Sequence, residues 1–339
     1  MKICVNCFND LELKQFIITN SVEKGKCDYC SGSLNFELLN IDELLDFFSE
    51  FINIFKNDPT GIPLNEIIQN DWNLFSSKSV CLAILSDILS TLNSSLTNPQ
   101  VSVCYISEII ENVSYWEKLK EDIKWNRRFL TNSDKLTELG WDSFFNKTIT
   151  WSKSEPLFRA RLHYSGDQKI FSFKDMGCPD KIKAPSGRAN PQGIPFLYLS
   201  TDIKTTLFEI RASYLDEVSV GKFEVANNNK MVLVDFTEIP SAFLYMDDII
   251  NYTKIILLKK YISSDLSKPI RRYDSELEYV PTQFICEYIR NITGVDGILF
   301  ESSLHLGGKN IVLFDQNIVK CISVEMYRVT KVEIEEQKL

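Results

Sequence analysis

The sequence predicts an α+β fold: an N-terminal cysteine knuckle and a small helical domain, followed by a mixed, mainly antiparallel β domain. Three observations support this. Four cysteines near the N-terminus form two close pairs, and apolar residues recur at helical spacing from about residue 38 to 150. Beyond residue 151, short apolar or alternating segments lie between Gly, Asn, Asp and Pro, as is typical of strands. We therefore expect domains at residues 1–36, 37–150 and 151–339.

The composition is that of an ordinary globular protein, with 339 residues, 44% of them hydrophobic, and a formal net charge of -9. This charge argues against a polybasic surface for nucleic acid, although locally placed arginines can still bind phosphates. The longest apolar stretch, residues 80–92, is interrupted by Asp87 and is too short to cross a bilayer. The N-terminus has no apolar signal core, so we expect a cytoplasmic protein without a membrane partner.

The N-terminal cysteines form the array C-x2-C-x19-C-x2-C, made of Cys4, Cys7, Cys27 and Cys30. Two CxxC turns can each present a pair of thiolates to one tetrahedral Zn2+. Four thiolates leave no position for water, so such a zinc would be structural. The alternative is four unligated thiols in an extended N-terminal segment. The chain has nine cysteines, and this odd number argues against a disulfide framework.

Three segments of the predicted helical domain have helical periodicity: residues 41–55, 78–92 and 113–130. The first carries its apolar residues along one face: Leu44, Leu45, Phe48, Ile52 and Phe55. Strands are expected near residues 155–164, 194–200, 218–225, 230–236, 296–302, 309–314 and 321–334. Two helices interrupt them, one at 203–213 after the N-cap candidate Asp202 and one at 281–292 between Pro281 and Gly294. Strands and helices do not alternate strictly, which argues against a doubly wound fold.

Several familiar sites are excluded by their motifs. The chain has no G-x-x-x-x-G-K-[ST], no G-x-G-x-x-G and no G-x-S-x-G. His163 and His305 are its only histidines, too few for a histidine-based catalytic metal site. The candidate functional residues are therefore a polar set in the strand-rich half.

Each member of this polar set also has an ordinary structural explanation. Arg159 and Arg161 are two apart on a candidate strand and share one face, which a solvated or ion-paired surface would explain. Arg188 follows Gly187 in a loop that could simply turn. Glu209 projects to the side of the apolar stripe of its helix, and Ser302 and Ser303 follow a strand, where turn or cap roles are common.

The order of these segments adds information that no single residue carries. "LFRAR", "GRANPQGIPFLYLS", "TTLFEIRA", "GILFESS" and "GGKNIVLFD" follow one another along residues 157–315. This order resembles the RES domain family, which is named for its Arg, Glu and Ser and is known from toxin–antitoxin toxins. The resemblance covers residues 151 to 325 and implies an ADP-ribosyltransferase-like architecture.

The N-terminal half is similar, more loosely, to the HEPN-like region found in a subset of RES proteins. HEPN ribonucleases use an R-x4-6-H pair, and residues 36 to 150 contain no histidine. We therefore expect a regulatory, dimerising or target-sensing role for this region, and no RNA cleavage.

The resemblance assigns roles residue by residue. The family Arg falls on Arg159, with Arg161 as the alternative because the two share a face. The family Glu falls on Glu209. The family Ser falls on Ser302, with Ser303 as a one-position alternative. The catalytic candidates are thus Arg159, Glu209 and Ser302, and the substrate-binding candidates are Arg161, Arg188, Tyr198 and Ser303.

The resemblance implies an enzyme that consumes NAD+ by cleaving its nicotinamide–ribose bond, through hydrolysis or phosphorolysis, with toxin or defence character. A carboxylate can stabilise the oxocarbenium-like ribose, an arginine can grip the pyrophosphate, and a serine hydroxyl can orient the substrate. A tyrosine ring can stack on nicotinamide. The alternatives are a protein ADP-ribosyltransferase and a non-catalytic protein that senses NAD or a related nucleotide. An antitoxin or a target protein is the expected partner, and a homo-oligomer stays open.

Overall fold

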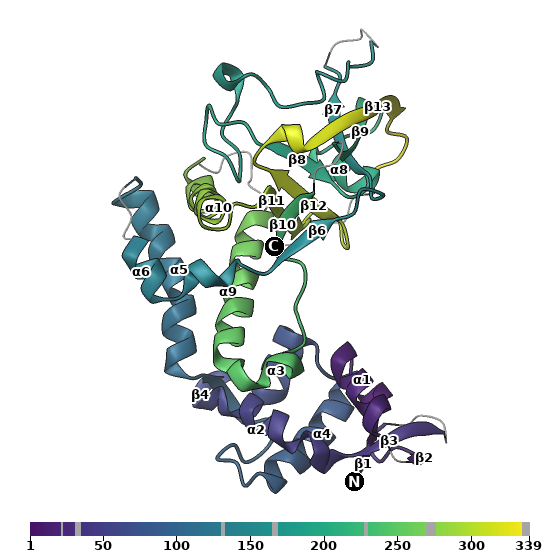
Figure 1. Cartoon of the computed structure of the whole chain (residues 1–339), viewed down its shortest axis with the longest axis vertical. Coiled ribbons are helices and arrows are strands. Elements are labelled where there is room, and N and C mark those ends of the chain that lie inside the picture. The colour runs from purple at the N-terminus through teal and green to yellow at the C-terminus, as the bar shows by residue number, and fades with distance from the viewer. Residues whose placement is uncertain are drawn as a thin grey trace. The chain divides into compact units, whose positions relative to one another are not determined.

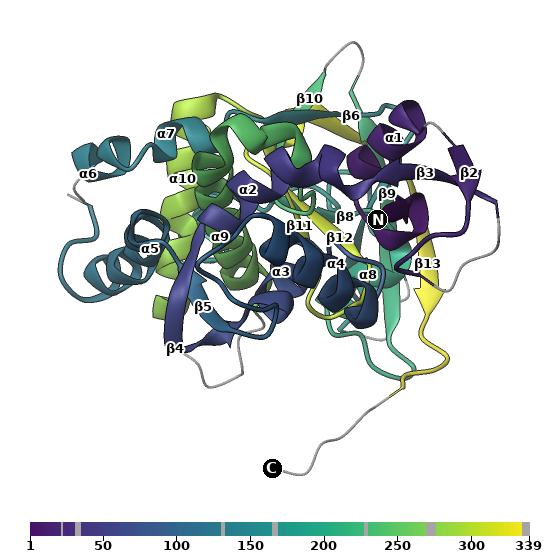
Figure 2. The ribbon, with the colours of Figure 1, turned by 90° about the horizontal axis from the view of Figure 1, so that it is seen from below.

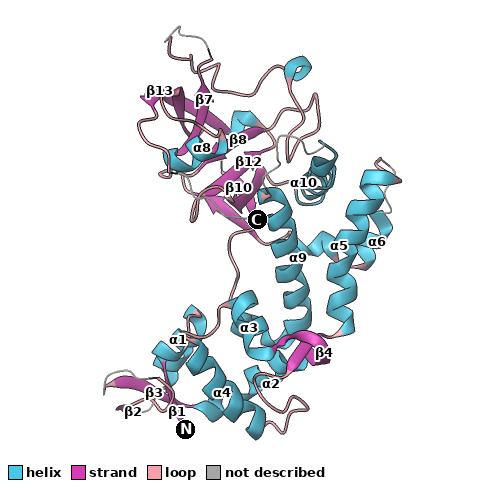
Figure 3. Cartoon of the chain, turned by 180° about the vertical axis from the view of Figure 1, so that it is seen from behind, coloured by secondary structure: helices cyan, strands magenta, loops and turns pink. Residues whose placement is uncertain are grey.

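The structure, a computed structural model, describes residues 1–21, 23–30, 35–129, 133–164, 169–226, 230–268 and 276–333 (Figure 1). The chain divides into two compact units. One consists of Met1–Trp116 and Ile239–Leu258, and the other of Glu117–Glu238 and Lys259–Leu339. The first is rich in helices and the second in strands (Figure 3). The division at residues 36 and 150 that the sequence suggests stays a prediction.

The first unit contains a small three-stranded sheet and a helical core. Its elements are β1 (Lys2–Cys4), α1 (Leu11–Asn20), β2 (Glu23–Gly25), β3 (Phe36–Asn40), α2 (Leu45–Asn53), β4 (Phe55–Pro63), α3 (Leu64–Trp72), α4 (Lys78–Thr91), β5 (Ser102–Tyr105), the first part of α5 (Ser107–Trp125) and the first part of α9 (Ile249–Ser267). The small sheet is antiparallel in the order β1-β3-β2. Leu44, Phe48 and Ile52 of the predicted stripe are buried in the core of this unit.

One feature of this unit differs from the prediction. Strands β4 and β5 form an antiparallel pair where the sequence predicted helices and no strand (Figure 2). β4 contains Asp58, Pro59 and Gly61 and has no apolar alternation. A Cβ at Gly61 would lie 2.2 Å from the carbonyl oxygen of Val103 in β5, so the backbones approach closely there. The pairing depends on this distant partner, which local periodicity cannot indicate.

The second unit is built on one eight-stranded sheet. Its elements are the end of α5, α6 (Ser133–Glu138), α7 (Trp141–Phe144), β6 (Thr148–Trp151), β7 (Leu157–Leu162), β8 (Leu197–Ser200), α8 (Ile203–Glu209), β9 (Glu217–Val225), β10 (Met231–Asp235), the end of α9, α10 (Val280–Thr293), β11 (Gly297–Glu301), β12 (Lys309–Leu313) and β13 (Val319–Arg328). The strand order is β13-β9-β7-β8-β12-β11-β10-β6. Only the β10–β11 pair is parallel among the described strands. The predicted mixed, mainly antiparallel sheet is confirmed.

Both helices predicted in this half are present. Asp202 caps α8, because its side chain accepts a 2.8 Å hydrogen bond from the Thr205 backbone N–H. Gly294 ends α10 with φ 66°. Helix α9 was not predicted. Its buried residues form no single stripe, because the buried side changes from the first half of the helix to the second: Ile249, Tyr252, Thr253, Ile256, Leu257, Leu258, Lys259, Ile262 and Leu266.

The two faces of the large sheet are covered differently. One face carries an apolar core that includes Leu157, Leu199 and Ile311. On the other face, α8 packs its apolar side chains against Ala160, Val218 and Val220 of β7 and β9. This packing places the C-terminal end of α8 beside β7 and β8. None of the helices in the described ranges is long and apolar enough to cross a membrane.

Candidate functional site

A cavity of about 690 Å3 lies where strands β7 and β8 diverge. The two strands share a single register pair, Phe158 opposite Ser200. Beyond this pair both strands contribute to the cavity wall, with Arg159 and Ala160 from β7 and Tyr198 and Leu199 from β8. Consecutive residues of a strand point to opposite faces, so a cavity lined by such neighbours lies at the strand edges. The separation of β7 and β8 thus opens the sheet to a ligand.

The carboxylate of Glu209 reaches this cavity from the last residue of α8. Its Oε1 atom accepts two hydrogen bonds of 2.7 Å, one from Ser302 Oγ and one from Asn310 Nδ2. Ser302 directly follows β11, and its oxygen also accepts from the backbone N–H groups of Leu304 and His305. The Glu209 side chain is therefore held in a fixed position by two neighbouring strand segments.

The two serine candidates have different surroundings. Ser302 is 8% exposed and its hydroxyl donates to Glu209. The Ser303 hydroxyl donates instead to the backbone carbonyl of Ser267. Neither serine is among the described residues that line the cavity. Ser302 thus lies behind Glu209, where it can act on a ligand through the carboxylate.

The two arginine candidates lie side by side on β7 and share one acceptor. Arg159 Nη1 and Arg161 Nη2 donate to the carbonyl oxygen of Gly177, at 3.2 and 2.8 Å. Arg159 lines the cavity, whereas Arg161 is not among the described lining residues. Burial, with the nearby charge of Arg161, lowers the pKa of Arg159 to about 10. A buried cation of this kind is stabilised when an anion binds next to it.

The loop of residues 186–190 is closely packed, and this explains its glycine. A Cβ at Gly187 would lie 2.6 Å from Asn190 Oδ1 and 2.7 Å from the Tyr198 hydroxyl. That hydroxyl donates to Asn190 Oδ1 at 2.7 Å and accepts from the Ala189 N–H at 3.0 Å. Burial raises the pKa of Tyr198. Only glycine leaves room for Tyr198 at this point.

Arg188 follows this glycine and lines the cavity. Its Nη1 donates to the carbonyl oxygens of Leu266 and Ser267 at the C-terminal end of α9, both at 3.2 Å. Its own carbonyl accepts from Thr282 Oγ1 of α10. The arginine is therefore anchored by two helices, and a guanidinium beside a helix C-terminus is also favoured by the helix dipole.

Ser200, Asn310 and Arg211 are among the residues of the cavity wall that sequence reasoning missed. Asn310 interrupts an apolar strand and is 7% exposed, and a buried polar side chain needs a hydrogen-bond partner. A polar residue within an apolar strand could therefore have indicated a buried hydrogen-bonding position. Arg211 has φ 53°, a left-handed conformation that is uncommon for a residue other than glycine. No pattern in the sequence indicates it.

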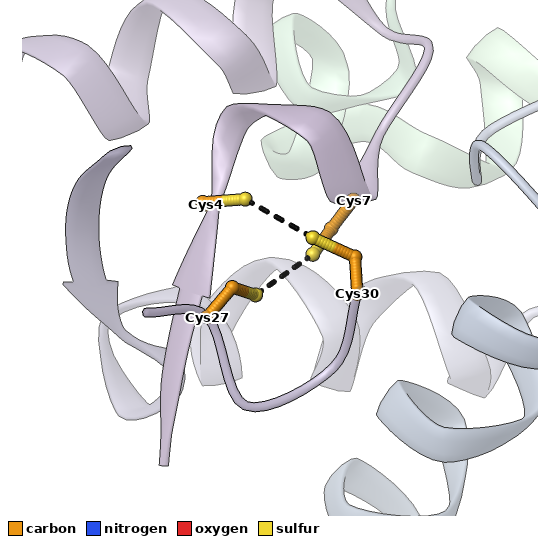
Figure 4. Close-up of side chains that lie close together, drawn as sticks. All are labelled: Cys4, Cys7, Cys27 and Cys30. Atoms are coloured by element: carbon orange, nitrogen blue, oxygen red, sulfur yellow. Dashed lines mark hydrogen bonds between the residues drawn. The ribbon is translucent and has the colours of Figure 1, made fainter. Parts of the chain in front are cut away.

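The four N-terminal cysteines converge on one point, as Figure 4 shows. Their sulfur atoms all lie within 4.8 Å of one another, with Cys4 and Cys30 at 3.5 Å and Cys7 and Cys27 at 3.4 Å. Zinc–sulfur bonds of about 2.3 Å in a tetrahedron place sulfur atoms about 3.8 Å apart. Hydrogen bonds from Cys4 and Cys7 lower the pKa of Cys27, so one thiolate is already favoured. The donor set and its spacing fit a zinc ion.

Comparison with known proteins yields a family match and one structural similarity. The model of the RES domain matches residues 156–332, more than half of the chain. A crystal structure of the M. tuberculosis MbcT–MbcA toxin–antitoxin complex contains a chain that is 13% identical. The similarity covers 56% of the present chain and 92% of that chain, with a TM-score of 0.31, which is too low to support an argument. No curated protein matched the sequence.

Proposed function

The chain belongs to the RES domain family, and from this membership and the cavity beside Glu209 we propose that the protein consumes NAD+ by cleaving its nicotinamide–ribose bond. One observation carries the proposal. The two residues that the family resemblance assigns to the ribose and to the pyrophosphate, Glu209 and Arg159, line the same cavity. A volume of about 690 Å3 falls within the range of small-molecule sites.

The reaction expels neutral nicotinamide from a cationic pyridinium and leaves an oxocarbenium-like ribose. A carboxylate next to C1 of that ribose stabilises the positive charge as it develops. Glu209 has this role in the proposal, and its rigid hydrogen-bonding supports it. In hydrolysis, a water oxygen then bonds to C1 and loses a proton to solvent or to a nearby base.

The other candidates divide into residues that touch the substrate and residues that act through a neighbour. Arg159 and Arg188 line the cavity and would hold the pyrophosphate through charge-assisted hydrogen bonds. The Tyr198 ring lines it and would contact nicotinamide. Arg161 would contribute its charge from beside Arg159. Ser302 would orient Glu209 in preference to binding the substrate itself.

Nicotinamide release from NAD+ by the purified full-length protein tests this function. We expect release by the wild type and at least a 100-fold lower rate for Glu209→Gln, because a neutral amide cannot stabilise the oxocarbenium charge. Glu287→Gln, which alters an exposed glutamate of α10, is the matched control and should keep the wild-type rate. Equal rates for Glu209→Gln and the wild type would contradict the proposed role of Glu209.

The same assay separates the alternatives. NAD+ labelled in its adenylate part leaves label on a protein if the acceptor is a side chain, and only on small products if it is water or phosphate. Binding of NAD+ without nicotinamide release would instead indicate a sensing protein. The toxin character implied by the family adds a partner to the proposal, an antitoxin that neutralises the activity or a protein target.

We also propose that Cys4, Cys7, Cys27 and Cys30 hold a structural zinc ion. The spacing of their sulfur atoms and their burial support it, because Cys4, Cys7 and Cys27 are at most 3% exposed. Tyr29, between the last two ligands, donates a 2.6 Å hydrogen bond to Asp87 of α4. The metal loop is thereby attached to the helical core of its own unit.

A further inference from the structure

We infer that Asn310 is a positioning residue for Glu209, and that Ser200 holds the Asn310 amide in place from its other side. The inference rests on the proposed function and adds to it the hydrogen bonds that keep the Glu209 carboxylate in place. Asn310 and Ser200 are opposite each other in the antiparallel pair of β12 and β8, so their side chains share one face. Both are buried, at 7% and 3% exposure.

The hydrogen bonds fix the orientation of the amide. A carboxylate can only accept, so the Asn310 atom 2.7 Å from Glu209 Oε1 has to be the nitrogen Nδ2. The amide oxygen then faces Ser200, whose hydroxyl donates to it at 2.8 Å. Ser200 is thereby a donor to Asn310, and Asn310 is a donor to Glu209. A reversed amide would put its oxygen against Glu209 Oε1 and lose that bond, although its nitrogen could still donate to the Ser200 hydroxyl.

The geometry also separates the two carboxylate oxygens. Ser302 and Asn310 both donate to Oε1 of Glu209. None of the described residues donates a hydrogen bond to Oε2. Two neutral donors hold this oxygen in place and add no charge of their own. Oε2 is left for the ribose, so the charge needed in the transition state is available at a fixed place. Asn310 would thus affect turnover more than substrate affinity.

Two substitutions of Asn310 test this positioning role, one by removing the donor and the other by adding a carboxylate. Asn310→Leu removes the donor and should lower kcat about 10- to 100-fold, because one hydrogen bond to a charged group is lost. The KM for NAD+ should change less than about threefold. Asn310→Asp keeps the shape but places a second carboxylate against Oε1. Two carboxylates at this distance share a proton. Activity at neutral pH should fall, and it should recover only in part at alkaline pH, because the ionised carboxylate of the Asn310→Asp variant no longer donates to Glu209. The acidic limb of the kcat profile should therefore move up by at least about one pH unit.

Ser200→Ala frees the amide to rotate and should lower kcat about threefold to tenfold. When Asn310→Leu is already present, Ser200→Ala should lower kcat no further, because the hydrogen bond from residue 310 to Glu209 is already lost. Ser219→Ala is the matched control. Ser219 is a fully buried strand serine of the same sheet that bonds to His163, and it is not among the described cavity residues. The other charged cavity residues, Arg159, Arg188, Arg211 and Glu276, are the same in every variant.

The measurement is nicotinamide release from NAD+ between pH 5.5 and 9.5, with a thermal unfolding curve for each variant. An unchanged acidic limb in Asn310→Asp, with folding intact, would overturn the positioning role. Additive losses of kcat in the double variant Ser200→Ala, Asn310→Leu would also overturn the positioning role. If Asn310→Asp fails to fold, the double-mutant cycle alone decides. Absence of nicotinamide release by the wild type at every pH would count against the proposed function, and the positioning role would fall with it. Release by the wild type with an unchanged kcat in a folded Asn310→Leu variant would overturn the positioning role alone.

Discussion

Ser302 and Glu209, 93 positions apart in sequence, are joined by a 2.7 Å hydrogen bond next to the cavity wall. The bond connects the segment after β11 to the end of α8. In the proposed reaction this bond would make Ser302 a residue that orients the Glu209 carboxylate, whereas the sequence suggested a contact with the substrate. On this proposal, turnover depends on how firmly Glu209 is held.

Ser302→Ala should lower kcat for nicotinamide release about tenfold, because Glu209 loses one of its two donors. Ser303→Ala is the control, since the Ser303 hydroxyl donates to the Ser267 carbonyl. It should keep kcat within about twofold of the wild type. Initial-rate kinetics on both variants decide between the two serines. A larger loss for Ser303→Ala would reverse the assignment of the family serine.

Arg159→Lys should raise the KM for NAD+ about 10-fold or more, because an ammonium cannot reproduce the planar, bidentate grip of a guanidinium on phosphate. Arg161→Lys should change KM less, because Arg161 is not among the described residues of the cavity wall. The measurement is KM together with the affinity for ADP-ribose by calorimetry. Equal effects on KM would mean that both arginines contact the pyrophosphate.

The sequence predicted elements whose signals are local. The N-cap Asp202 and the terminal Gly294 mark the boundaries of α8 and α10 through short-range backbone chemistry. It missed α9, whose buried side changes along the helix. It also missed the β4–β5 pair, whose two strands are distant in the chain. Periodicity detects one face that stays buried along a segment, so it fails where the buried face changes or where no apolar alternation is present.

The site shows the same limit at the level of single residues. Residue type and order predicted Glu209 and Arg159 as site residues. Both line one cavity, and their roles stay predictions. They did not separate Arg159 from Arg161, or Ser302 from Ser303, because a one- or two-residue difference is resolved only by the direction of each side chain. Asn310 was missed for a related reason: its partner lies 101 positions away.

Arg211→Gly should be more stable than Arg211→Ala by about 1 kcal/mol. Arg211 has φ 53°, which glycine adopts without steric cost and alanine does not. Both variants remove the same side-chain atoms beyond Cβ, so any contact of the guanidinium is lost equally. Urea unfolding of the pair isolates the backbone strain. Since Arg211 lines the cavity, both should also have a raised KM for NAD+.

Purified protein should contain one zinc ion per chain, measured by metal analysis. Cys27→Ser should lose it and destabilise the first unit, because metal binding contributes directly to folding in small thiolate sites. Cys81→Ser removes a buried thiol of α4 outside the cluster and should keep the metal. A strong chelator should reproduce the effect of Cys27→Ser on the wild type. Zinc retained at one equivalent by Cys27→Ser would exclude this four-thiolate site.

Lys259 should make stability rise with pH in the alkaline range. Its side chain is buried, its ammonium donates to the Asp235 carbonyl, and burial lowers its pKa from 10.5 to about 8. Between these two values the unfolded chain holds a proton that the folded chain has released, so rising pH favours folding. From pH 7.5 to 9.5 the wild type should gain about 2 kcal/mol relative to Lys259→Met.

The measurement is urea unfolding of both proteins at several pH values, and only the difference between them is interpreted, because buried cysteines and tyrosines titrate in the same range with the opposite sign. Lys320→Met, which removes an exposed lysine of β13, controls for the loss of one positive charge and should follow the wild type. A constant difference between wild type and Lys259→Met would show that Lys259 stays charged in the folded protein. A falling difference would mean that a negative partner stabilises its ammonium more than burial penalises it.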